Sequence, residues 1–274
     1  MNPKVSICIP TYNSPKLFRS CLESIVIQTY KDYEIIVTDD STNEEIENII
    51  NEFNFGNKIK YFKNRIRLGT PENWNEASRH ASGDYIKMLH HDDKFYDENS
   101  LFDFVMMLEK NPDSNFAFCA SQQISETDEC LSIHSTTTKQ LKLLRENPNF
   151  LFLGNFIGAP STTIYKKDNM IEYDIKLRWL VDIDFYIRKI NDKFIYSSKT
   201  LVKILEDGKN QVTREFEKNL KLQKEESIYL FNKIKKTNNF SYSIIFYKYF
   251  NLLKIEIKKI LIKTRIIKFF NKND

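Results

Sequence analysis

The 274-residue sequence predicts an α/β fold, with a mostly parallel central sheet, helices on both faces and a C-terminal helical extension. Four short apolar runs in the first 90 residues begin 28, 26 and 26 residues apart. The stretches between them carry apolar residues at helical spacing. Strand–helix–strand units of about 30 residues imply parallel strands joined by right-handed crossovers.

The four apolar runs are the expected strands of the first half. They are VSICI from Val5, YEIIVT from Tyr33, IKYF from Ile59 and YIKML from Tyr85. Two sets of apolar residues indicate the first connecting helices: Leu17, Cys21, Leu22 and Ile25, then Ile46, Ile49, Ile50 and Phe53. Ser41, Thr42 or Asn43 would cap the second helix, and Thr70–Pro71 would cap and begin the third.

After Leu89 the alternation is looser. We expect a helix over Asp97–Lys110, a strand at Phe116–Ser121, no clear pattern over 122–150, and a loop and short strand within Gly154–Tyr165. A helix over Asp182–Ile190 and a strand at Lys199–Leu205 follow, and the chain is helical from Val212, with a break at Thr237–Asn239. This predicts a body over 1–210, with halves at about 1–94 and 95–210, and a separate region over 211–274.

Composition indicates a globular intracellular protein. Hydrophobic residues make up 41% and charged residues 28%, and no apolar run is long enough to span a membrane. The N-terminus lacks the features of a signal peptide. None of the four cysteines forms a CxxC pair, so we expect reduced thiols and a cytoplasmic location.

Charge is distributed unevenly. Residues 232–274 hold 11 Lys/Arg and 2 acidic residues, a net +9, so the total of +4 leaves −5 for the rest. The tail mixes aromatic and branched residues with lysines at helical spacing. A basic amphipathic helix of this kind suits an anionic membrane surface, and a helix packed on the body or on a second copy is the alternative.

Polar clusters follow three of the four strands: PTYN (Pro10–Asn13), DDST (Asp39–Thr42) and HHDD (His90–Asp93). Ligands of open parallel sheets bind beyond the carboxyl ends of the strands, so we expect these clusters to converge on one site. Glycine loops of the P-loop or dinucleotide-binding type are absent from the sequence, which disfavours those classes.

Each cluster has a functional and a structural interpretation. The adjacent carboxylates of HHDD repel each other and suit Mg²⁺ or Mn²⁺ on a nucleotide diphosphate, or they form a solvated acidic turn. Zinc is disfavoured because no Cys or His partner has zinc-like spacing. DDST accepts hydrogen bonds from a base or ribose, or caps a helix, or does both, with Asp39 supporting the turn and Asp40 facing the ligand. Tyr12 in PTYN either stacks on a base or is buried in a turn.

Three longer strings occur in the order VSICIPTYN, SIVIQTYKDYEIIVTDDST and NRIRLGTPENWNEASRHASGDYIKMLHHDD. Together they resemble the family 2 glycosyltransferases of bacterial polysaccharide and lipopolysaccharide synthesis. The resemblance is close over about 4–94 and looser, through GAPSTTIYKK and LVDIDFYIRK, to about 205. It implies the A-type, Rossmann-like glycosyltransferase fold over 1–210, with a donor half (1–94) and an acceptor half (95–210).

The resemblance implies a nucleotide-binding role for residues of the three clusters. Pro10 and Tyr12 match positions that line the uracil, with Asn13 beside them. Asp40 matches the carboxylate that contacts the base. Asp92 and Asp93 match the metal motif for Mn²⁺ or Mg²⁺, with Asp92 nearer the ribose and Asp93 on the metal. Many relatives are acidic at the position of His91.

Other matching residues lie farther along the chain. Gly69, Asn73 and Asn75 match the loop and helix start that pass near the nucleotide, and Arg65 or Arg67 could contact the diphosphate. Asp182 matches the catalytic base of an inverting transfer. Asp184 lies about 200° around the helix from Asp182 and is expected to pair with Arg188, its i+4 neighbour.

The implied activity is transfer of a hexosyl or N-acetylhexosaminyl group from a UDP-sugar to a saccharide acceptor. The acceptor would be a glycan or a polyprenyl-diphosphate-linked saccharide, reached by a peripheral protein at the inner face of the cytoplasmic membrane. The alternative is a non-catalytic or nucleic-acid-binding protein that uses the basic tail. We do not expect nucleic acid as a partner, because the body is acidic and carries no such motif.

Overall fold

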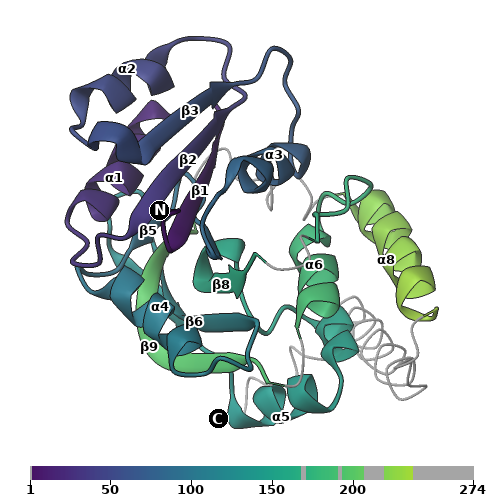
Figure 1. Ribbon diagram of the computed structural model, residues 1–274. Coiled ribbons are helices and arrows are strands. Elements are labelled where there is room, and N and C mark those ends of the chain that lie inside the picture. Colours follow the sequence, from purple (N-terminus) through teal and green to yellow (C-terminus); the bar gives the residue numbers. More distant parts are fainter. Residues whose placement is uncertain (1, 168–170, 191–192, 207–218, 237–274) are drawn as a thin grey trace, which may run out of the picture.

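The computed structural model describes residues 2–167, 171–190, 193–206 and 219–236. Figure 1 shows a curled sheet that runs through the molecule with helices packed around it. The donor half contains β1 (Val5–Thr11), α1 (Pro15–Val26), β2 (Tyr33–Asp39), α2 (Glu45–Glu52), the 3₁₀ turn η1 (Gly56–Lys58), β3 (Ile59–Lys63), α3 (Glu72–His80) and β4 (Tyr85–Met88).

The acceptor half is built from shorter and more varied elements. It contains β5 (Lys94–Phe95), α4 (Ser100–Glu109), β6 (Phe116–Ile124), β7 (Cys130–His134), α5 (Thr138–Glu146), the 3₁₀ turns η2 (Pro148–Leu153) and η3 (Pro160–Thr162), β8 (Thr163–Lys166), α6 (Val181–Lys189) and β9 (Ile195–Leu205). The last described element is α8 (Leu220–Ile234).

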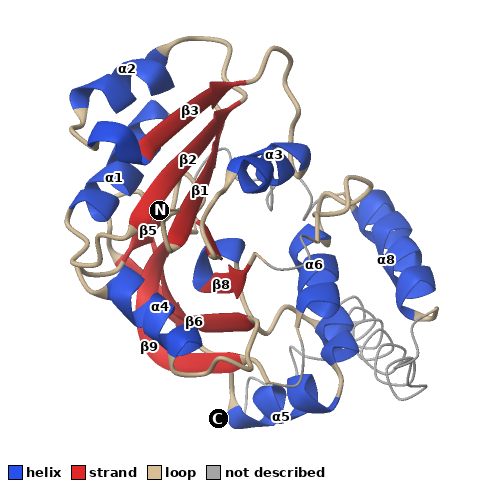
Figure 2. Cartoon of the chain, in the orientation of Figure 1, coloured by secondary structure: helices blue, strands red, loops and turns tan. Residues whose placement is uncertain are grey.

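The strands of the described residues form one sheet in the order β3-β2-β1-β4-β8-β6-β9-β5, with β7 paired to β6 (Figure 2). As predicted, β1 to β4 are parallel, and β1 pairs with both β2 and β4. In the acceptor half, β8 runs antiparallel to β4 and β6, whereas β9 is parallel to β6. The sheet therefore combines a parallel donor half with a mixed acceptor half.

Helices cover both faces of the sheet, as predicted. All seven residues of β1 and of β2 are buried, as expected for strands covered on both sides. Side chains alternate between two apolar cores: Val5, Ile7 and Ile9 pack with α1, α2 and α4, and Cys8 packs with α3 and α6. The second core also receives Leu230 and Ile234 of α8, so this helix packs in the same core as α3 and α6.

Several predicted boundaries were wrong. The helix expected to begin at Asp97 begins at Ser100, and the third helix begins at Glu72 with Pro71 at its N-cap position. The second helix has Glu44 at its N-cap position. Asn43, the residue before Glu44, accepts a hydrogen bond from the Glu45 amide. Residues 122–150, where the sequence showed no clear pattern, contain β7 and α5. The helical prediction for 212–218 and for 237–274, including the break at 237–239, lies outside the described residues.

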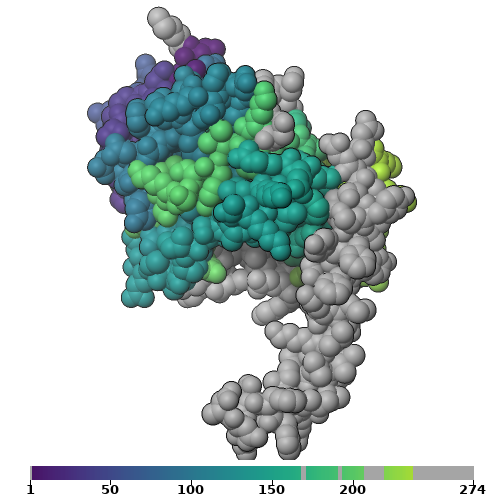
Figure 3. Space-filling view, turned by 90° about the horizontal axis from the view of Figure 1, so that it is seen from below, coloured from purple at the N-terminus to yellow at the C-terminus, as the bar shows by residue number. Residues whose placement is uncertain are grey.

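On the face seen in Figure 3, the green surface of β9 lies between the purple-to-blue donor half and teal residues from the middle of the chain. This strand pairs with β6 over most of its length and with β5 at its other edge. The Leu205 end of β9 also contacts Asp93, as described below. The last strand thereby ties the acceptor half to the acidic loop of the donor half.

Candidate active site

The three polar clusters lie together at one edge of the sheet. The Asp40 amide donates to the Thr11 carbonyl (3.0 Å), and the Asn13 amide donates to the Ser41 hydroxyl (2.8 Å). The third cluster joins them through His91, whose Nδ1 is 3.1 Å from the Pro10 carbonyl oxygen. Strands β1, β2 and β4 are adjacent and parallel, so their carboxyl ends bring these loops together.

Asp39 has a structural role in the DDST cluster. Its fully buried carboxylate accepts hydrogen bonds from the Thr11 hydroxyl (3.0 Å), the Ser41 amide (2.9 Å) and the Lys63 ammonium (2.8 Å). Burial alone would raise its pKa, but the hydrogen bonds from Lys63 and Ser41 outweigh burial and lower it. Asp39 therefore stays ionised and clamps β1, β2 and β3 together.

Asp40 instead faces the segment 64–69. Its carboxylate accepts hydrogen bonds from the Gly69 amide (2.7 Å), the Leu68 amide (3.0 Å) and the Asn64 side chain (2.8 Å). Gly69 has a φ of +72°, which glycine adopts without strain. A carboxylate offers about four acceptor positions, so Asp40 keeps one position for a ligand.

The same segment contacts Tyr12. The guanidinium carbon of Arg67 lies 3.9 Å from the centre of the Tyr12 ring, which is a cation–π contact. The segment 64–69 thus contacts both side chains expected to meet the base.

The two asparagines of α3 are engaged with the protein. Asn73 is buried and donates to the Thr11 and Thr38 carbonyls, at 3.3 Å each, so it braces the ends of β1 and β2. Asn75 exchanges hydrogen bonds with the backbone of Tyr173, at 2.7 and 3.0 Å. In the structure this side chain is bound to the acceptor half. The contact predicted between Asn75 and the nucleotide stays a prediction.

The acidic loop after β4 contains two carboxylates in different surroundings. Asp93 is 3% exposed and accepts hydrogen bonds from the Leu205 amide (3.3 Å) and from Ser161. Burial, and then the neighbouring charge of Asp92, raise the pKa of Asp93. Asp92 is half-buried, and among the described residues its carboxylate has no hydrogen-bond or ion-pair partner. Asp92 is therefore the carboxylate more available to a ligand.

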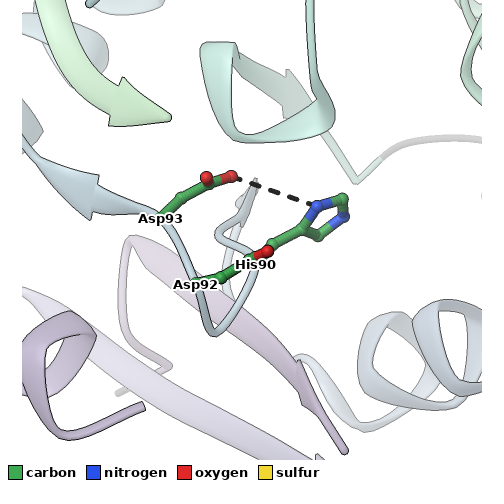
Figure 4. Close-up of side chains that lie close together, drawn as sticks. All are labelled: His90, Asp92 and Asp93. Atoms are coloured by element: carbon green, nitrogen blue, oxygen red, sulfur yellow. Dashed lines mark ion pairs between the residues drawn. The ribbon is translucent and has the colours of Figure 1, made fainter. Parts of the chain in front are cut away.

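His90 lies beside this pair, as Figure 4 shows. Its Nδ1 is 4.0 Å from Oδ2 of Asp93, and its ring packs on Trp74 with the ring centres 4.6 Å apart. Burial lowers the pKa of His90 to about 4. His90, Asp92 and Asp93 each offer a ligand atom within 4.8 Å of the other two. Carboxylate oxygens and a neutral imidazole are ligands of divalent cations, so these residues fit a metal ion.

Asp182, the predicted base, lies in the first turn of α6. Its carboxylate accepts hydrogen bonds from the Ile183 amide (2.8 Å) and the Asn155 side chain (2.6 Å). Burial raises its pKa to about 6, and these hydrogen bonds limit the rise. Asp184, by contrast, forms ion pairs with Arg188 (2.6 Å) and Lys233 (2.7 Å), and the pairing expected with Arg188 is present.

One short segment, 155–162, links Asp182 to the acidic loop. At one end Asn155 holds the Asp182 carboxylate. At the other end the Ser161 hydroxyl accepts a hydrogen bond from the His90 amide (3.0 Å) and contacts Asp93. The sequence assigned this segment to a Gly/Pro-marked loop, but nothing in it identified Asn155 or Ser161 as site residues. The available signal was the GAPS string at 158–161, just before the short strand β8 (Thr163–Lys166).

Comparison with known proteins defines the class. The family model described as "Glycosyl transferase family 2" matches residues 6–173, and the chain belongs to this family. The protein is a glycosyltransferase, as its sequence predicted. An uncharacterized glycosyltransferase of Methanocaldococcus jannaschii, MJ1057, is 32% identical over 281 residues, which are 96% of this chain and 94% of that protein.

Another relative matches a shorter part of this chain. The GalNAc(5)-diNAcBac-PP-undecaprenol beta-1,3-glucosyltransferase of Campylobacter jejuni is 34% identical over 94 residues, which are 34% of this chain and 30% of that protein.

Two solved structures share the fold. The TarS 1–349 structure from S. aureus in complex with UDP-GlcNAc has a TM-score of 0.60 at 20% identity, covering 77% of this chain and 60% of that one. The mannosyltransferase PcManGT from Pyrobaculum calidifontis, in complex with GDP-Man and Mn²⁺, has a TM-score of 0.55 at 15% identity, covering 79% and 60%. The predicted A-type glycosyltransferase fold is confirmed.

In the parts of the chain that the structure describes, the helices are too short or too polar to cross a bilayer.

Proposed function

We propose that the protein transfers a sugar from a UDP-sugar to a saccharide acceptor with inversion, assisted by Mn²⁺ or Mg²⁺. The observation that carries this proposal is the contact between the PTYN, DDST and HHDD loops at one edge of the sheet. These loops carry the ring of Tyr12, the Asp40 carboxylate with a spare acceptor position, and the Asp92 carboxylate, which has no partner among the described residues. A base, a ribose and a metal-bound diphosphate need these groups.

The donor half would bind the nucleotide. Pro10, Tyr12 and Asn13 would line the base, and Asp40 would accept from its N–H. Gly69 and the start of α3 at Asn73 and Asn75 would border the ribose and diphosphate. TarS, which was solved with UDP-GlcNAc, supports the choice of a uridine donor through its shared fold.

The acidic loop would hold the cation through Asp92 and Asp93. When bound, a divalent cation neutralises negative charge on the departing diphosphate. The raised pKa of Asp93 supports this role, because a neighbouring cation would offset the cost of ionising two adjacent carboxylates. The Mn²⁺ complex of PcManGT supports a divalent ion at such a site.

Asp182 would act as general base. Its carboxylate would take the proton from an acceptor hydroxyl as that oxygen bonds to the anomeric carbon, while the bond from this carbon to the diphosphate breaks and UDP leaves. A pKa of about 6 leaves Asp182 ionised at neutral pH yet more basic than an ordinary aspartate, which suits proton transfer.

The test is donor hydrolysis without an acceptor. Purified protein would be incubated with UDP-hexoses and UDP-N-acetylhexosamines, with Mn²⁺ or with a chelator. We expect slow release of UDP from at least one donor, and only with the metal. Absence of release from every donor, together with failure to bind UDP in calorimetry, would contradict the proposal.

We extend the proposal to a polyprenyl-diphosphate-linked acceptor at an anionic membrane surface. The basic composition of 232–274 supports it, as does the name of the Campylobacter jejuni relative. Each Lys or Arg near such a surface contributes about 1 kcal/mol. Full-length protein should therefore co-sediment with phosphatidylglycerol-containing vesicles and lose this binding in high salt. Equal binding to neutral phosphatidylcholine vesicles would contradict it.

A further inference from the structure

We infer that His90 is a nitrogen ligand of the divalent cation and biases this site toward transition-metal ions over Mg²⁺. The inference rests on the proposed metal-assisted function and adds a residue to its carboxylate pair. From the sequence we expected Asp92 and Asp93 to hold the metal, and His91 was the residue of this loop that departs from the acidic residue of many relatives.

The position of the ring supports this assignment. His90 Nδ1 lies 4.0 Å from Oδ2 of Asp93, and His90, Asp92 and Asp93 each offer a ligand atom within 4.8 Å of the other two (Figure 4). Ligand atoms about 2.1 Å from one cation lie roughly 3 to 4.2 Å apart, so small side-chain rotations bring all three into range. Adjacent carboxylates alone do not define a site, but here a third donor of another chemical type faces them.

The surroundings of His90 hold the ring in this orientation. Trp74 packs against one part of the imidazole, and the His90 amide is fixed by the Ser161 hydroxyl at 3.0 Å. Nε2 is buried without a hydrogen-bond partner among the described residues. Nδ1 is the ring nitrogen that lies near a carboxylate, at 4.0 Å from Asp93.

His91 provides a contrast within the same loop. Its Nδ1 lies 3.1 Å from the Pro10 carbonyl oxygen, so this nitrogen is engaged with the PTYN loop. Two adjacent histidines thus point to different partners, and only His90 joins the group with Asp92 and Asp93.

Ligand chemistry gives the expected preference. Mg²⁺ takes oxygen ligands and keeps much of its water, whereas an imidazole ligand favours first-row transition metals. A site with one nitrogen and two carboxylates should therefore bind Mn²⁺ or Co²⁺ more tightly than Mg²⁺. Replacing His90 should reduce that difference.

The experiment is pulsed electron paramagnetic resonance of Mn²⁺ bound to the full-length protein with UDP. An imidazole ligand couples its directly bonded ¹⁴N to the Mn²⁺ electron spins and modulates the echo. We expect this modulation in the wild type and in His91→Asn, and its loss in His90→Asn. Labelling histidine with ¹⁵N in His91→Asn should replace the ¹⁴N pattern, which tests the ligand even if His90→Asn does not fold.

Metal competition provides the second readout. We expect His90→Asn to lower Mn²⁺ affinity by at least about tenfold, with little change in Mg²⁺ affinity. Even mutations of residues that only hydrogen-bond to a metal ligand reduce metal affinity about 10–100-fold. Bound Mn²⁺ without histidine coupling would overturn the inference and leave the proposed function intact. A wild-type protein that binds no Mn²⁺ with UDP would overturn the metal-assisted function itself.

Discussion

At the scale of single residues, Asp182 and Asp184 show how two carboxylates on one helix differ. Asp182 has no cationic partner among the residues that the structure describes, and burial raises its pKa to about 6. Asp184 is paired with Arg188 and Lys233. Asp182→Asn should lower turnover about 10²–10⁴-fold and leave UDP affinity unchanged. The matched variant Asp184→Asn should lower thermal stability and reduce turnover far less. Equal turnover in Asp182→Asn and wild type would remove Asp182 from the reaction.

The same residue predicts a pH dependence. Because the base must be ionised, turnover should fall as pH drops below about 6, the pKa to which burial raises Asp182. Initial rates from pH 5 to 8 at saturating donor and metal would measure it. A profile that stays flat down to pH 5 would contradict the assignment.

Lys87 of β4 is a cation buried in the apolar core. Its ammonium donates to the carbonyls of Met88 (3.1 Å) and Ser161, and burial lowers its pKa to about 7. In the unfolded chain Lys87 has a pKa near 10.5. Between pH 7 and 10 it therefore keeps a proton that Lys87 of the folded chain has lost. The contribution of Lys87 to the free energy of unfolding should therefore rise between pH 7 and 10, by at most about 1.4 kcal/mol per pH unit.

Comparison with Lys87→Met isolates this effect, because the buried thiols of Cys8, Cys21 and Cys119 have raised pKa values and act in the opposite direction. Chemical denaturation of both proteins at pH 7, 8 and 9 would measure the difference. The wild type should gain stability relative to Lys87→Met as pH increases. A constant difference would contradict the shifted pKa.

Residue-level chemistry was partly visible in the sequence. The three clusters predicted which loops meet, because polar residues follow strands of one parallel sheet. One interpretation of DDST already gave Asp39 to the turn and Asp40 to the ligand. The partners that produce this division, Lys63 and the amides of 68–69, were not visible, because the fold brings them in. For the same reason, the sequence did not show that His90 faces Asp93 while His91 faces Pro10.

At the scale of elements, the segment 155–162 joins the base and the acidic loop. Gly158 makes its turn possible: φ is +102°, and an added Cβ would lie 3.3 Å from His134 and from Thr162. Its amide donates to the Asn155 side chain at 2.9 Å, which positions the asparagine that holds Asp182. A side chain at 158 would therefore disturb this arrangement.

Gly158→Ala should lower stability by about 1–3 kcal/mol and also reduce turnover. Gly56→Ala is the matched control, because Gly56 has a φ of +57° with open space around it and lies far from the segment in sequence. Gly56→Ala should lower stability and leave turnover unchanged. Thermal denaturation and initial rates would be compared for both. Equal losses of turnover in the two variants would contradict the linking role of 155–162.

Elements with strong periodicity were predicted well, and exposed ones were not. Strands β1, β2 and β4 are apolar runs buried on both faces. Strand β7 is exposed along most of its length and Leu144 is the one buried residue of α5, so neither carries a run of buried apolar residues like those of β1 and β2. Hydrogen bonds across the sheet and a capping box at Thr137 define them instead.

At the scale of the whole molecule, the order of strands could not be read from local patterns. Strand β5 follows β4 in the chain but lies at the far edge, beyond β9, and β8 lies between β4 and β6. These pairings join residues that lie from 45 positions apart, as for Phe118 with Thr163, to 109 positions apart, as for Lys94 with Lys203. They depend on contacts between distant segments, which periodicity does not report.

The most direct measurement is a crystal structure of the full-length protein with UDP and Mn²⁺, with the metal located by its anomalous scattering. We predict one Mn²⁺ peak between the diphosphate and the side chains of His90, Asp92 and Asp93, with uracil against Tyr12 and Asp40. UDP bound elsewhere, or Mn²⁺ remote from the loop after β4, would contradict it.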